Sequence, residues 1–64
     1  MDRMPGLLAV VRLRREKTFY VVVAEYPQDQ KVDLISITGP EHRMRGVALT
    51  AILEVVEGPP RGLE

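Results

Sequence analysis

The stretch TGPEHRMRGVALTAILEVVEGPP, Thr38 to Pro60, decides the fold, because its two ends carry helix signals and its middle alternates like a strand. Thr38 and Glu41 have the spacing of a capping box, in which each side chain bonds a free backbone N–H of the other residue. Pro40 falls in the first turn, where no N–H is needed. Gly58 and the two prolines after it form a stop signal. Residues 41–57 are therefore predicted to be helical.

Periodicity within this stretch permits both interpretations. At 100° per residue, one side is apolar and the opposite side is polar apart from a glycine. The apolar side carries Met44, Val47, Ala48, Ala51, Ile52 and Val55, and the opposite side carries Arg43, Gly46, Thr50, Glu54 and Glu57. Alternation from Val47 to Val56 also fits a strand, but the distance between the two end signals is typical of a helix. The alternative is a short helix or loop over Pro40–Arg45 and then a fourth strand over Val47–Val56.

Upstream, three runs rich in β-branched and aromatic residues predict strands over Leu7–Arg15, Thr18–Tyr26 and Lys31–Thr38. Together with the helix they predict an α+β fold: a three-stranded antiparallel meander with one C-terminal helix packed on one face (βββα). The alternative without the helix is an all-β small SH3-like barrel. Residues 1–64 are expected to form one domain with its core at about 6–57, followed by a flexible tail over 58–64.

A single helix can cover only one face of this sheet. If Leu13 pairs with Tyr20, the covered face holds Leu7, Ala9, Val11, Leu13, Tyr20, Val22, Ala24, Ile35 and Ile37. The open face then holds Leu8, Val10, Phe19, Val21, Val23, Val32 and Leu34. Exposed apolar patches of this kind mark interfaces. These seven residues are therefore the predicted oligomer interface, and a two-fold homodimer is the simplest assembly.

Size and composition also favour a partner. A chain of 64 residues without cysteine has neither disulfides nor thiolate metal sites to support a small core. Nine basic and nine acidic residues balance, which excludes a polybasic or an acidic disordered chain. The apolar run near the N-terminus is interrupted by Arg12 and is too short to span a membrane. We expect a cytoplasmic protein with no membrane partner. The predominance of arginine over lysine, the absence of asparagine and the short loops suggest a thermophilic or GC-rich source.

No residue set supports an enzyme. Ser36 lacks a nucleophile-elbow motif, and His42 has no side chain at ligand or triad spacing. Three carboxylates near the second turn, Glu25, Asp29 and Asp33, fit solvent exposure better than acid–base work. No phosphate-binding glycine motif is present. We expect no catalytic residue, metal, cofactor or small-molecule substrate.

Basic residues gather at the first hairpin. Arg12, Arg14, Arg15 and Lys17 lie close to Phe19, and arginines beside an aromatic ring on an open sheet suit nucleic acid. The alternative is that they are solubilising charges paired with Glu16, Glu25 and Glu41. The balanced net charge counts against nucleic acid. The sequence thus predicts a non-enzymatic interaction module that self-associates, with a small nucleic-acid-binding regulator as the alternative.

Overall fold

The chain folds as five antiparallel strands in the sheet order β4-β3-β2-β1-β5, as a computed structural model of residues 4–60 shows. The strands are β1 (Val10–Leu13), β2 (Phe19–Tyr26), β3 (Lys31–Ser36), β4 (Arg43–Ala48) and β5 (Ile52–Glu57). Two 3₁₀ turns, η1 (Pro27–Asp29) and η2 (Leu49–Ala51), complete the regular structure of this part of the chain. Within it no helix is long and apolar enough to cross a membrane.

The predicted α+β fold is wrong, since residues 4–60 contain no α-helix. Thr38 and Pro40, which were expected to begin the helix, bond to strand residues instead. Thr38 Oγ1 accepts a hydrogen bond from the Phe19 N–H at 3.2 Å. Ser36 Oγ donates to the Pro40 carbonyl and accepts from the His42 N–H, which closes the β3–β4 loop. Gly46 has a φ of 65°, a left-handed conformation that interrupts any right-handed helix.

The alternative with one long strand from Val47 to Val56 is also wrong. The chain turns at η2, and its two halves become β4 and β5, which lie at opposite edges of the sheet. Because these two edges do not pair with each other, the sheet is open. The expectation of one long strand fails because the side chain of Leu49, which is only 2% exposed, turns into the core at η2. The Leu49 N–H donates to the Gln30 carbonyl, which fixes the turn against the β2–β3 connection.

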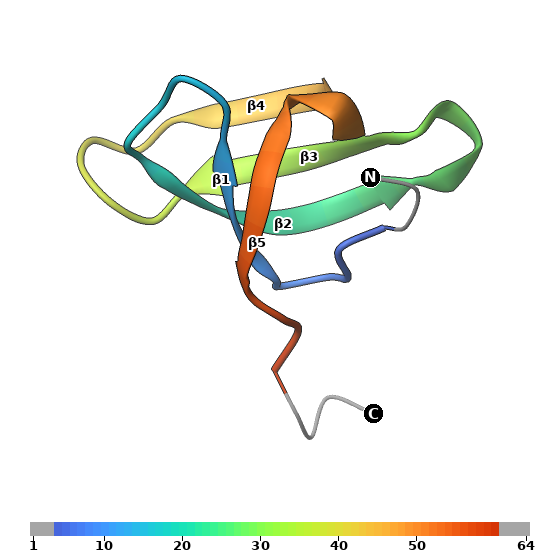
Figure 1. Cartoon of the computed structure of the whole chain (residues 1–64), viewed down its shortest axis with the longest axis horizontal. Helices are drawn as coiled ribbons and strands as arrows, with labels where there is room; N and C mark the ends of the chain where they lie inside the picture. The colour runs from blue at the N-terminus through green and yellow to red at the C-terminus, as the bar shows by residue number, and fades with distance from the viewer. Residues whose placement is uncertain (1–3, 61–64) are drawn as a thin grey trace.

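The core lies where the sheet folds over itself. Figure 1 shows β1 and β5 running across β2, β3 and β4. The buried side chains are Ala9, Val11, Leu13, Tyr20, Val22, Val32, Leu34, Leu49 and Ile52. Burial of this apolar set is the main force that holds the sheet in its folded-over form. The result is a small compact domain with a radius of gyration of 10.8 Å.

Strand β3 faces the opposite way from the prediction. Tyr20 pairs with Ser36 and Val22 with Leu34, so Leu34 points into the core beside Val22. The expected inward residues Ile35 and Ile37 lie outside, and Ile37 is 51% exposed. A shift of one residue in a strand exchanges its two faces. The expected pairing of Leu13 with Tyr20 is wrong as well, because Val11 pairs with Tyr20 and the β1–β2 loop is correspondingly longer.

Two register shifts shape the middle of the sheet. Val22 pairs with Leu34 and Ala24 with Asp33, so Val23 is an extra residue in β2. Beyond this bulge the inward–outward alternation changes, and Ala24 moves to the outer side. In β4 the shift lies opposite Asp33 and contains Gly46, whose positive φ is the conformation that a glycine bulge requires.

Candidate functional site

The outer face of the sheet is the side of β2, β3 and β4 that points away from the core, together with the adjoining outer side of β1. Strand pairing arranges its residues in rows, because directly paired residues of an antiparallel sheet lie on the same face. One row runs Val10, Val21, Ile35 and Arg43 from β1 to β4. The row beside it contains Arg12 opposite Phe19. The outer face is therefore apolar along its middle and carries arginines on both sides.

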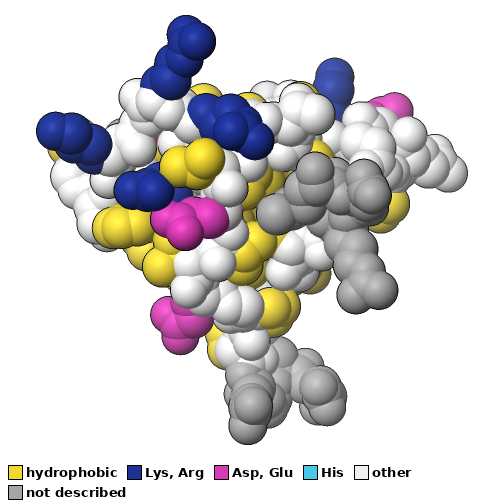
Figure 2. Space-filling view, viewed as in Figure 1, with side chains coloured by type: hydrophobic (Ala, Val, Ile, Leu, Met, Phe, Trp, Pro, Cys, Tyr) yellow, Lys and Arg dark blue, Asp and Glu magenta, His cyan; other side chains and the backbone are white. Residues whose placement is uncertain are grey.

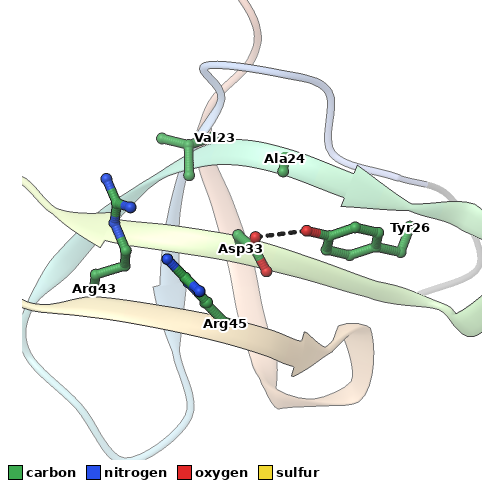
Figure 3. Close-up of a pocket in the computed structure, with 6 residues that line it drawn as sticks. All are labelled: Val23, Ala24, Tyr26, Asp33, Arg43 and Arg45. Atoms are coloured by element: carbon green, nitrogen blue, oxygen red, sulfur yellow. Dashed lines mark hydrogen bonds between the residues drawn. The ribbon is translucent and has the colours of Figure 1, made fainter.

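A pocket of about 340 Å³ opens on this face near the end of β2. Its lining residues come from three adjacent strands: Val23, Ala24 and Tyr26 from β2, Asp33 from β3, and Arg43 and Arg45 from β4. Figure 3 shows the six side chains on one side of the sheet, with β1 and β5 behind it. Both bulges contribute, since they bring Ala24 and Tyr26 outward and set Arg45 beside Asp33.

Two hydrogen bonds hold the side chain of Asp33 in place within this pocket. Its Oδ2 accepts a hydrogen bond from the Tyr26 hydroxyl at 2.7 Å, and its Oδ1 accepts one from the Gly46 N–H at 2.9 Å. The Gly46 N–H and the Tyr26 hydroxyl, with smaller contributions from the charges of Arg45 and Arg43, lower the pKa of Asp33 below its ordinary value of 3.8. The hydrogen bond that the Tyr26 hydroxyl donates to Asp33 raises the pKa of Tyr26. At neutral pH the pocket therefore holds a carboxylate and a neutral phenol.

The pocket arginines make no ion pair within residues 4–60. The single ion pair of that segment joins Arg12 to Glu54 at 2.9 Å, on β1 and β5. Arg43 and Arg45 are both exposed, and Asp33 is half-buried between them and Tyr26. Two guanidinium groups against one carboxylate leave one positive charge at the pocket, so the site is suited to an anion.

The first hairpin places its basic residues at one end of the molecule. In Figure 2, Lys and Arg side chains gather over the end where the β1–β2 and β3–β4 loops lie. Arg14, Arg15 and Lys17 are exposed in the β1–β2 loop. Arg14 Nε donates to the Thr50 carbonyl at 3.0 Å, while Arg15 has a φ of 66°.

The expected carboxylate partners of these residues are engaged elsewhere or form no ion pair. Glu16 accepts a hydrogen bond from the Tyr20 hydroxyl, and Glu25 accepts one from the Gly6 N–H. Glu41 is exposed, and it forms no ion pair within the described residues. The solubilising ion pairs offered as the alternative for the basic hairpin are thus not formed with these three glutamates, and Arg14, Arg15 and Lys17 keep their charges available.

The seven residues predicted as an oligomer interface differ in burial and fall into three groups. Val32 and Leu34 are fully buried in the core and have no surface to offer a partner. Val10, Phe19 and Val21 are half-buried on the outer face. The two others are exposed: Val23 lines the pocket at 38% exposure, and Leu8 precedes β1 at 41%.

Residues 4–60 contain no group of three or more histidine or acidic side chains that could hold a metal ion. His42 is exposed at the start of β4, and Asp29 lies in η1, apart from the pocket. Sequence reasoning missed the pocket, although one signal was available: Arg43 and Arg45 alternate immediately before a glycine, which is typical of a strand leading into a bulge. The tail expected over 58–64 lies mostly outside the described residues.

No family model matches this chain, and no curated protein or solved structure is significantly similar to it.

Proposed function

We propose that this protein is a small single-stranded nucleic-acid-binding module that uses the outer face of its sheet. The observation that carries the proposal is an aromatic side chain at each end of β2, with an arginine of β1 on one side and two arginines of β4, beyond β3, on the other. Phe19 lies opposite Arg12, and Tyr26 lines the pocket with Arg43 and Arg45. Aromatic rings on a sheet stack unpaired bases, and flanking arginines hold the phosphates between them.

The geometry suits a short strand of nucleic acid. Phe19 and Tyr26 are separated by most of the length of β2, on the order of 20 Å at the usual rise per residue of a strand. Tyr26 is 43% exposed, and Phe19 is half-buried with its outer side free of any covering helix. The apolar residues between them, Val21 and Val23, offer contact area to bases without forming hydrogen bonds, which favours binding that tolerates many sequences.

The distribution of charge on the surface supports this function, although the net charge of the chain is zero. The zero net charge is distributed unevenly, since Arg14, Arg15 and Lys17 are exposed together in the β1–β2 loop and Arg43 and Arg45 both line the pocket. Phosphate binding depends on the local field rather than on the total charge of the chain. With few phosphate contacts, the affinity is expected to be modest and to fall steeply with salt.

The test is fluorescence anisotropy of labelled single-stranded DNA and RNA twelve-mers at several salt concentrations. Each phosphate contact on a single strand contributes about 0.7 to the slope of log K against log salt. Arg45→Gln should reduce this slope by about 0.7 and the double variant Arg43→Gln/Arg45→Gln by about 1.4. Leu53→Glu is the matched control, because it also lowers the net charge by one but lies on β5, at the other edge of the sheet.

A slope that Arg45→Gln leaves unchanged, or that Leu53→Glu changes equally, would refute binding at the outer face. Absence of any binding at low salt would refute the nucleic-acid function as a whole.

Self-association through the same face is the second candidate. It is favoured by the continuous apolar row of Val10, Val21 and Ile35 across three strands. Light scattering after size exclusion, with and without an oligonucleotide, separates the two functions. A dimer that Val21→Lys converts to a monomer supports self-association, whereas a monomer that gains mass only with the oligonucleotide supports nucleic-acid binding.

A further inference from the structure

We propose that the pocket around Asp33 holds one base of the bound strand and selects guanine. This inference rests on the proposed function and adds a specific contact to it. It starts from the carboxylate of Asp33, which is an unusual group to find at the centre of a surface offered to phosphates. A carboxylate repels phosphate but accepts hydrogen bonds from the donors on a base edge.

Asp33 retains the capacity to accept two further bonds. Each carboxylate oxygen has two lone-pair positions. One position of Oδ1 is used by the Gly46 N–H and one of Oδ2 by the Tyr26 hydroxyl. One position therefore remains on each oxygen. The two bonds already made also fix the orientation of the group, because they hold it between β2 and the bulge of β4.

Guanine is the base whose Watson–Crick edge matches this arrangement. Its N1–H and its exocyclic N2 amino group are adjacent donors, and a carboxylate accepts such a pair side by side, as it does from a guanidinium. Adenine and cytosine each present one donor beside an acceptor, and uracil presents one donor between two carbonyl oxygens. An ionised carboxylate without a proton to donate repels those acceptors, so the other bases gain less at this position.

The other residues that line the pocket suit the ring of the base and the phosphates of the nucleotide. The ring of Tyr26 and the side chains of Val23 and Ala24 form the apolar part of the pocket. Arg43 and Arg45 rise from β4 on the same face as Asp33. A base placed with its donors on Asp33 has its phosphates within the field of these two arginines. The volume of about 340 Å³ falls at the small end of the range for ligand pockets.

The experiment compares three RNA eight-mers by anisotropy: all uridine, uridine with one central guanosine, and uridine with one central inosine. Inosine keeps N1–H and lacks the N2 amino group. The guanosine eight-mer should bind about tenfold more tightly than the uridine eight-mer, within the range known for a good bidentate contact to a base. The inosine eight-mer should fall between them. This series uses the unaltered protein, so it does not depend on the folding of any variant.

Asp33→Asn should abolish the preference, because the side-chain amide replaces one acceptor with a donor. Asp29→Asn is the matched control: it removes the same charge from an exposed position in η1 and should leave the tenfold ratio unchanged. The ratio of affinities is the readout, since both variants raise the affinity for every oligonucleotide by removing a negative charge. Thermal melting of each variant confirms that it is folded.

Equal binding of the guanosine and uridine eight-mers would overturn the guanine site and leave the nucleic-acid function standing. So would a preference that survives in Asp33→Asn. If none of the three eight-mers binds at low salt, both the site and the proposed function are overturned.

Discussion

Truncation of neighbouring residues in β3 tests the register on which the outer face depends. Leu34 is fully buried, whereas Ile35, the next residue, is half-buried and points outward between Val21 and Arg43. Leu34→Ala removes three carbon atoms from a closed core and should cost about 2–5 kcal/mol. Ile35→Ala removes side-chain carbons that are already partly in water, and we expect about 1 kcal/mol.

The size of the domain makes this difference decisive. A chain of 64 residues has a free energy of unfolding of roughly 3–10 kcal/mol. Leu34→Ala is therefore expected to leave a large fraction of the molecules unfolded or close to it, whereas Ile35→Ala should remain folded. Urea denaturation followed by far-ultraviolet circular dichroism measures both, and the slope against urea should be similar in the two variants if the folded states are equally compact.

Two further measurements make the comparison secure. Val32→Ala and Ile37→Ala form a second pair, with the buried residue again expected to cost more. Each curve is recorded at two protein concentrations, because self-association through the outer face would make the stability depend on concentration. If Ile35→Ala costs as much as Leu34→Ala, or more, β3 faces the other way and the outer face described above does not exist.

Three other predictions concern local contacts. Gly46→Ala should lower the free energy of unfolding by about 1–2 kcal/mol, because alanine is strained at a φ of 65°, while Gly58→Ala should change little in urea denaturation. The pKa of Asp33 is lowered on folding, so its contribution to stability is present above the ordinary value of 3.8 and disappears as the pH falls through the folded value; melting temperatures below pH 4 should show a loss that Asp33→Asn lacks. The pKa of Tyr20 is raised by its bond to Glu16 and by burial, so the contribution of Tyr20 to stability is fully present below its ordinary pKa of 10.0 and is lost as the pH rises through the folded value; Tyr20→Phe should remove this alkaline decline in melting curves.

The existence of the first two strands and the inward residues near their turn could be predicted from the sequence, because the alternation there is regular, but their pairing and the bulge at Val23 could not. Val11, Leu13, Tyr20 and Val22 point inward as expected. The orientation of β3 could not be predicted in the same way. Both of its faces are apolar, with Val32 and Leu34 on one side and Ile35 on the other, so its pattern does not distinguish the core side from the outer side. The pairing with β2 decides this, and pairing is a property of the tertiary structure.

The stretch from Thr38 to Pro60 misled because some of the residues that signal a helix have another role in the sheet. Thr38 accepts a hydrogen bond from Phe19 of β2, the Pro40 carbonyl accepts one from Ser36 across the β3–β4 loop, and Gly46 supplies a left-handed bulge in place of a turn of helix. Tertiary contacts override weak local propensity in such a segment. The positive φ of Gly46 could be recognised only once the pairing of β4 in the sheet was known.

Of the candidate site, the basic hairpin could be read directly, since Arg12, Arg14 and Arg15 are close in sequence. The pocket could not. Tyr26, Asp33 and Arg45 meet only because β2 and β4 each contain an extra residue. Gly46 marks the bulge of β4 in the sequence, but nothing in the composition of β2 marks the bulge at Val23, and neither strand shows which residues lie opposite it.

The irregular strands at the two sides of the sheet have a consequence for the behaviour of this protein at high concentration. A chain without net charge has no general repulsion between copies, and a straight free strand would recruit a second molecule by backbone pairing. Here β4 contains the Gly46 bulge and two exposed arginines, and the pairing of β5 with β1 is shifted twice along its short length. Neither side offers a regular ladder to another copy. The same bulge that shapes the pocket therefore also makes the β4 edge a poor template for backbone pairing with a second copy.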